Sequence, residues 1–99
     1  MSLDVNHFSL SASVAEVDAL RYTPSGVPAL NCKLEHASEI SEANQVRQVR
    51  AVVKSVCFGS VAESLARQDI GSHWHFTGFL ATPRGSKQLM FHIQTFAKD

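Results

Sequence analysis

The chain has 99 residues, nine basic and nine acidic side chains, a net charge of zero and a hydrophobic content of 44%. This length suits one domain, residues 1–99, that buries a single core without metal or disulfide staples. Zero net charge gives no overall basic footprint, so nucleic-acid binding would need positive side chains sorted onto one face. No charged leader precedes an apolar core, and no apolar run approaches the roughly 18 residues of a membrane span. We expect a soluble, intracellular protein.

The cysteines, Cys32 and Cys57, lie in apolar, strand-like segments and form no C-x-x-C pair. Structural disulfides persist mainly in oxidising compartments, and free cysteine behaves as a small hydrophobic residue. We therefore interpret both residues as reduced core thiols of a cytosolic protein.

The first predicted strand covers residues 7–20 and changes phase once. Phe8 to Val14 are apolar at even positions, whereas Ala15 to Ala19 are apolar at odd positions. One extra residue flips the side-chain faces beyond it, so the slip predicts a β-bulge near Val14–Ala15. A strand bent in this way can serve two sides of a small barrel.

The next segment begins with a turn, because Pro24 presets φ and Gly26 accepts a positive φ. An alternating run follows, so we expect a half-buried strand over residues 29–36, with Leu30, Cys32 and Leu34 on one face and Lys33 on the other. Residues 37–45 are polar, acidic and without a strand pattern. We interpret them as a mobile loop.

A third strand is predicted over residues 46–58, with Val49, Ala51 and Val53 inward and Arg50 and Lys54 outward. Val56 breaks this phase, which predicts an irregularity near Ser55. Gly59 ends the strand, and Ser60 with Glu63 fits a helix capping box. The short helix, with Val61 and Leu65 as its apolar stripe, is expected to plug one end of the fold.

Two more strands complete the pattern, residues 73–81 and 89–96, joined by a loop over residues 82–88. Trp74 and Phe76 are expected to face the core, as are Leu89, Phe91 and Ile93 on the last strand. Five strands with one helix between the third and fourth is the element order of an OB-fold, a five-stranded Greek-key barrel. The alternatives are another small β-barrel or a two-sheet sandwich.

The sequence offers little for catalysis or metal binding. His73, His75 and His92 have no acidic or cysteine partner at a recognised metal-ligand spacing. The serines lie in no nucleophile elbow, and no glycine-rich phosphate loop precedes a helix. We expect no enzyme, no metal and no cofactor.

The basic residues are the remaining candidates, because an OB-fold binds oligonucleotides on its second and third strands and in two hairpin loops. The residues that fall there are Arg21, Tyr22, Lys33, Arg50, Lys54, Arg84 and Lys87. The acids Glu16 and Asp18 are expected to lie away from this groove, on the first strand. Tyr22 is the best candidate for an exposed ring that stacks on a base.

Several short motifs resemble the primosomal replication protein N family, small bacterial relatives of the single-stranded DNA-binding proteins. They are Thr23-Pro-Ser-Gly-Val-Pro28, Leu34-Glu-His36, Arg47-Gln48, Gly71-Ser72 and Gly78-Phe79-Leu80. The resemblance implies an OB-fold homodimer of the bacterial cytoplasm that binds single-stranded DNA. It further implies that the protein acts with the primosomal helicase PriA and other primosome components to restart stalled forks. It places DNA contacts on Arg21, Arg50, Arg84 and Lys87.

Two alternatives to this function stay open. Net charge is zero, and Arg50 stands where the family can carry an exposed tryptophan. These features suit a protein-interaction module of the primosome with weak or no DNA binding of its own. Fold analogy alone also permits an RNA-binding or tRNA-associated OB-fold.

Overall fold

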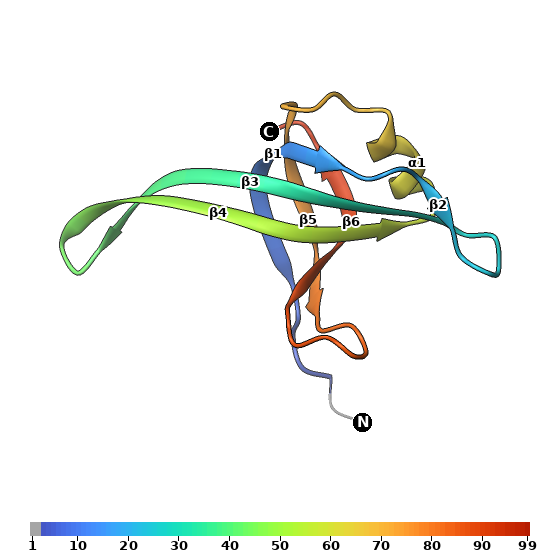
Figure 1. The fold of residues 1–99 in the computed structure, drawn as a ribbon. Helices are drawn as coiled ribbons and strands as arrows, with labels where there is room; N and C mark the ends of the chain where they lie inside the picture. The colour runs from blue at the N-terminus through green and yellow to red at the C-terminus, as the bar shows by residue number, and fades with distance from the viewer. Residues whose placement is uncertain (1–2) are drawn as a thin grey trace.

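The computed structural model describes residues 3–99 and shows a β-barrel from which one long hairpin projects (Figure 1). Its elements are β1 (Phe8–Val17), β2 (Arg21–Tyr22), β3 (Pro28–Glu42), β4 (Gln45–Phe58), α1 (Ser60–Ala66), β5 (His73–Ala81) and β6 (Met90–Ala97). None of the helices in the described part of the chain has the length and apolar character needed to cross a membrane.

The strands close into a ring. Their order is β1-β5-β6-β4-β3, and an additional pairing of β1 with β3 completes the circle. The β4–β6 pair is parallel, whereas the other pairs are antiparallel. With α1 between β4 and β5, this is the predicted five-stranded OB-fold. The sequence did not predict β2, a two-residue strand that extends the sheet by pairing with the start of β3.

The bulge in β1 is confirmed and explains the closure. Residues Phe8–Ser13 pair with β5, residues Ser13–Val17 pair with β3, and the register shifts between Val14 and Glu16. One bent strand therefore belongs to both sides of the barrel. Ala12 and Val14, which precede the shift, are fully buried.

The core is apolar and lies inside this ring. Leu30, Leu34, Phe76 and Phe91 are fully buried, and Trp74 packs against them while partly exposed. The helix α1 adds Ala62 and Leu65 to the same cluster. The predicted inward position of Leu89 is wrong: its side chain is 62% exposed, because β6 begins one residue later and Leu89 belongs to the preceding loop.

Two local predictions around the end of β4 are also wrong. The ladder between β3 and β4 runs through Ser55 without a register shift, and Ser55, Val56 and Cys57 are all buried. At Ser55 and Val56, β4 pairs with β6 on one edge and with β3 on the other, so it is a central strand of the sheet there. The capping box does not form, because Gly59, with φ 76°, is the N-cap and no side chain caps the helix.

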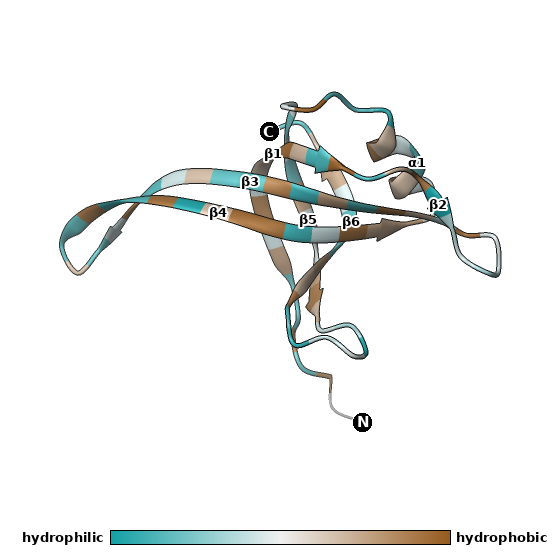
Figure 2. Cartoon of the chain, in the orientation of Figure 1, coloured by the Kyte–Doolittle hydropathy of each residue, from teal (hydrophilic) through white to brown (hydrophobic). Residues whose placement is uncertain are grey.

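The predicted mobile loop at residues 37–45 is a regular hairpin. β3 continues to Glu42, β4 begins at Gln45, and the two strands pair along their whole length. Ala43 (φ 51°) and Asn44 (φ 65°) form the two-residue turn, and positive φ at both positions is the type I′ geometry that suits strand twist. Figure 2 shows hydrophilic and hydrophobic residues mixed along this hairpin. Both of its sides face solvent, so the burial pattern that marks a strand is absent from the sequence.

Candidate nucleic-acid interface

The outer face of β3 and β4 is the surface formed by the side chains that alternate with the core positions. On β3 it carries Asn31, Lys33 and Glu35, and on β4 it carries Arg50, Val52 and Lys54. Within the barrel, Leu30, Cys32 and Leu34 point the other way and are buried. The predicted outward direction of Lys33, Arg50 and Lys54 is therefore confirmed.

Two lysines meet at the centre of the outer face. Lys33 and Lys54 are direct cross-strand partners, so their ammonium groups project from neighbouring positions. Together with Glu16, Asp18 and Asn31 they line a shallow cavity of about 280 Å³. This is a concave surface with two cations on one wall.

The expectation that the acids lie away from this groove is wrong for Glu16 and Asp18. Glu16 is the strand partner of Lys33, and its carboxylate lies 3.1 Å from the Lys33 ammonium. The Asp18 backbone N–H donates to the carbonyl of Asn31 at 2.9 Å, which holds Asp18 beside the same cavity. The bulge in β1 turns Glu16 toward Lys33, a consequence that the strand pattern alone did not reveal.

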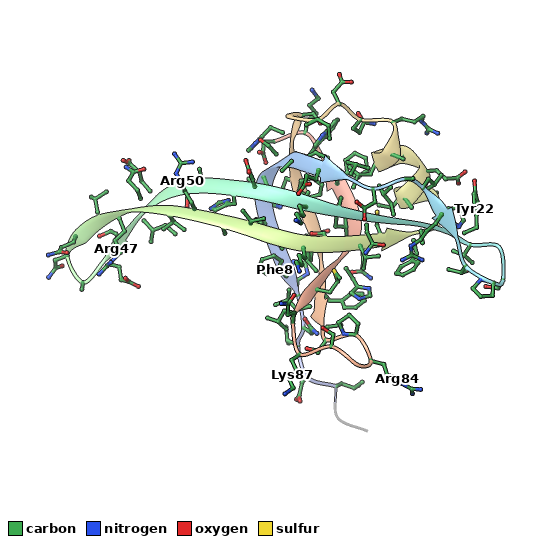
Figure 3. The ribbon with its side chains drawn as sticks, in the orientation of Figure 1. Phe8, Tyr22, Arg47, Arg50, Arg84 and Lys87 are labelled. Atoms are coloured by element: carbon green, nitrogen blue, oxygen red, sulfur yellow. The ribbon has the colours of Figure 1, made fainter. Side chains whose placement is uncertain are left out.

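The loop between β5 and β6 reaches the outer face through one hydrogen bond. The Lys54 ammonium donates to the side-chain carbonyl of Gln88 at 2.9 Å. Arg84 and Lys87 lie in this loop and are exposed, and Figure 3 shows both side chains at its outer rim. The loop can therefore bring two further cations to a ligand that contacts Lys54.

Arg21 lies at one end of the outer face. Tyr22, the next residue of β2, pairs with Pro28 and lies on the opposite face of the sheet. The Arg21 guanidinium donates to the Asn31 side-chain oxygen from Nε at 3.2 Å and from Nη2 at 2.8 Å, which fixes its direction along β3. Tyr22 is 62% exposed, as expected for a ring that is open to a base. The turn that follows is confirmed, since the Gly26 N–H donates to the Thr23 carbonyl at 2.8 Å.

Arg50 lies toward the other end, on the hairpin that leaves the barrel. It is exposed, and its strand partner is Ala37. At about 3.3 Å per residue it is about 13 Å from Lys54 along β4. In Figure 3, Arg50 lies on the projecting part of the β3–β4 ribbon, and Tyr22 lies beside the other end of that ribbon. Arg47 on the same hairpin is paired with Glu42 at 2.7 Å.

Phe58 is an exposed ring that the sequence reasoning missed. It follows Lys54 and Val56 on the outer face of β4, and 43% of it is exposed. Its ring stacks on His92 at 6.0 Å, and His92 stacks on Phe79 at 4.7 Å between centroids. Extending the alternation from Lys54 by four residues would have identified this second ring.

The histidines do not form a metal centre. His73 Nε2 lies 3.0 Å from one Asp99 carboxylate oxygen, and His75 Nδ1 lies 3.7 Å from the other, while His92 lies on a different part of the sheet. Over residues 3–99 no group of three or more histidine, cysteine, aspartate or glutamate side chains could hold a metal ion.

The thiols are buried and form no disulfide. Burial raises the pKa of Cys32 to about 12, helped by the neighbouring Cys57, and burial raises the pKa of Cys57 to about 11. Both stay protonated near neutral pH, and a protonated thiol is neither a nucleophile nor a metal ligand. Their environment is that of core residues.

Comparison with known proteins gives a consistent result. The model of a family described as "another single-strand binding protein family" matches residues 6–95. Replication restart protein PriB from Bordetella pertussis is 40% identical over 91 residues, which are 91% of this chain and 85% of that protein. PriB from Neisseria meningitidis serogroup B is 36% identical over 90 residues, covering 90% of this chain and 89% of that protein.

Comparison with solved structures leads to the same family as comparison of the sequences. PriB from Ralstonia solanacearum superimposes with a TM-score of 0.87 at 36% identity, covering 96% of this chain and 98% of that chain. The single-stranded DNA binding protein from Thermus aquaticus has the same fold, with a TM-score of 0.75 at 20% identity over 94% of this chain and 49% of that chain.

Proposed function

This chain belongs to the replication restart PriB proteins of the single-strand binding protein family, and from this we propose that it binds single-stranded DNA during replication restart. It acts as a non-catalytic accessory protein in the bacterial cytoplasm. DNA lies along the outer face of β3 and β4.

The observation that carries this proposal is the arrangement of cations along one ribbon. Lys33 and Lys54 lie side by side on adjacent strands, and Arg50 follows Lys54 on β4. Lysine and arginine side chains bind phosphates and supply most of the affinity in sequence-independent binding. Arg84 and Lys87 lie on the loop that Gln88 ties to Lys54, and they add two exposed cations beside this surface.

The aromatic rings supply a second kind of contact. Phe58 is exposed near the end of the outer face, where Arg21 and Phe58 are aligned through Ala29 on the strand between them. Tyr22 is exposed at the same end, on the opposite face of β2, where a single strand that passes over the edge can reach it. A base stacked on such a ring contributes ~1–3 kcal/mol and does so for every base type. Phosphate contacts along β4 and stacking at its end therefore favour single strands over duplexes.

The protein further acts as a homodimer that stimulates the primosomal helicase. Support for the dimer comes from β1, where residues Phe8–Ala12 pair with β5 on one edge and have no strand on the other among residues 3–99. An open edge of this kind is protected when two copies pair about a two-fold axis. Sedimentation at micromolar concentration tests this, and a monomer contradicts it.

The DNA-binding proposal is tested by fluorescence anisotropy with labelled oligo-dT over a range of salt concentrations. The double variant Arg84→Ala/Lys87→Ala should bind more weakly and flatten the salt slope by about 1.4, since each phosphate contact on a single strand contributes about 0.7. A matched control, Arg67→Ala/Lys98→Ala, removes the same charge from the C-cap of α1 and from the C-terminal segment. If the loop variant keeps its affinity at low salt, the loop residues do not contact DNA.

A second candidate function is a protein-interaction module with weak or no DNA binding of its own. The observation that favours it is the Glu16–Lys33 ion pair, which neutralises one cation of the outer face. Unwinding assays with the helicase distinguish the two functions. Stimulation of unwinding without measurable oligo-dT binding favours the interaction module, and competition between DNA and RNA oligomers tests the preference for DNA.

A further inference from the structure

A carboxylate occupies the centre of the surface proposed to bind DNA. Glu16 follows the β1 bulge. The register shift there pairs Glu16 with Lys33, whereas the unshifted register that begins at Val14 and Leu34 would pair it with Cys32. Its carboxylate lies 3.1 Å from the Lys33 ammonium, which is ion-pair distance. A phosphate that binds the Lys33 ammonium therefore competes with a carboxylate that already contacts it.

The ion pair has a structural reason to exist in the free protein. Lys33 and Lys54 are directly opposite on adjacent strands, and like charges in this arrangement destabilise a sheet. Glu16 offsets the repulsion, and Asp18 adds a second negative charge to the same cavity. The two ammonium groups and two carboxylates are therefore balanced locally before any ligand binds.

The pair is also exchangeable. The Glu16 side chain is 65% exposed and that of Lys33 is 46% exposed, so water and salt screen their attraction. Ion pairs this exposed contribute little to stability. A DNA phosphate can therefore replace the carboxylate, and the small free energy needed to break the ion pair reduces the affinity for DNA.

We propose that Glu16 is an internal competitor of the DNA phosphate for Lys33. In the free protein its carboxylate neutralises Lys33, and in the complex a phosphate displaces it. Glu16 thereby lowers the affinity and the salt dependence of the site and keeps binding readily reversible. This inference rests on the proposed function, because it concerns the regulation of the same surface.

The test uses the full chain and oligo-dT at several salt concentrations. The variant Glu16→Gln keeps the side-chain shape and removes the charge, and it should bind about two- to fivefold more tightly at low salt, the range expected for one exposed ion pair. Its salt slope should steepen toward the value for one further phosphate contact. The control Glu63→Gln makes the same charge change on α1 and should match the unmodified protein.

A double-mutant cycle separates competition from a general charge effect. In a Lys33→Gln background, Glu16→Gln should tighten binding less, because the carboxylate then has no ammonium to block. Although Glu16→Gln should raise the affinity for DNA, it should slightly lower the Tm of the protein without DNA. The reason is that Lys33 and Lys54 are then left facing each other with no carboxylate from Glu16.

The outcomes separate this inference from the function on which it rests. If the unmodified protein binds oligo-dT and Glu16→Gln binds no more tightly than Glu63→Gln, the competitor role is wrong and DNA binding stands. If neither the unmodified protein nor Glu16→Gln binds at low salt, both fall. Binding by Glu16→Gln alone supports the competitor role, because removing the carboxylate then uncovers the site.

Discussion

The barrel and the projecting hairpin, residues 36–51, are formed by the same strands, β3 and β4, but different interactions hold them. Inside the barrel, Leu30 and Leu34 are fully buried. Beyond Glu35 no residue of the hairpin is buried. The barrel is therefore stabilised by burial, whereas the hairpin is stabilised by its hydrogen-bonded ladder and its turn. β3 and β4 therefore run without a break from the barrel into the hairpin, while the interactions that stabilise them change.

This difference divides the proposed interface into two parts. Lys33 and Lys54 stand on the barrel, where the backbone beneath them is fixed by core packing. Arg50 stands on the hairpin, which has no buried residue and is expected to open without unfolding the core. DNA is therefore expected to bind first to the barrel, which is a fixed platform, and then to the hairpin, which is a more mobile arm.

The largest expected effect breaks the barrel alone. Phe76→Ala removes a fully buried ring from the core and should lower the free energy of unfolding by about 4 kcal/mol. Ile40→Ala on the hairpin removes a side chain that is 50% exposed and should change it by less than about 0.5 kcal/mol. Urea unfolding followed by circular dichroism measures both.

These two variants are controls for each other. A loss of similar size at Ile40 would mean that the hairpin is packed against something in solution, for example a second copy of the chain. Repeating the unfolding at several protein concentrations distinguishes that case, because association makes the midpoint depend on concentration.

A smaller effect comes from pH and is confined to the barrel. The pKa values of Cys32 and Cys57 are raised to about 12 and about 11, while the unfolded thiols ionise near 9.0. Below pH 9 the thiols are protonated in both the folded and the unfolded protein, and the folded protein keeps its full stability. As the pH rises from 9.0 toward the folded pKa values, the unfolded thiols ionise first and the free energy of unfolding falls. From pH 8 to pH 10 the ionisation of the two thiols should lower the free energy of unfolding by about 3 kcal/mol in total.

Urea unfolding at the two pH values measures this loss. Cys32→Ala should remove about half of the pH dependence, whatever its effect at pH 8. An identical pH dependence in that variant contradicts the assignment, because lysine and tyrosine groups titrating in the same range would then explain the loss. Ile40→Ala should keep the full pH dependence.

The sequence predicted the barrel well because burial leaves a pattern. Alternation identified all five barrel strands, and the phase slip at Val14 identified the bulge. The same reasoning failed for residues 37–45, where both faces are solvated and no alternation is needed. It also failed at Ser55, where burial on both faces of β4 resembles a break in the strand.

The candidate site could be predicted only in part. The strand positions of Lys33, Arg50 and Lys54 followed from alternation, but their neighbours did not. That Glu16 meets Lys33 depends on which residues pair across the bulge, and pairing is a property of the closed barrel. Alternation along a strand therefore predicts which basic side chains lie on a surface, but it does not predict which acidic side chains pair with them.

The most local expected effect concerns the hairpin turn. Ala43 adopts φ 51°, a conformation that favours asparagine or glycine over alanine. The double substitution Ala43→Asn/Asn44→Gly installs the preferred type I′ pair and should stabilise the hairpin locally by about 1 kcal/mol. Hydrogen exchange should then slow about fivefold for the hairpin amides, while the global unfolding midpoint stays within error.

The opposite substitution completes this test of the comparison. Asn44→Val places a β-branched residue at φ 65° and should speed exchange in the hairpin only. If both variants instead shift the global midpoint in proportion to their local effects, hairpin and barrel unfold as one unit. Arg50 would then be as fixed as Lys33 and Lys54, and DNA would meet a single rigid surface rather than a platform and an arm.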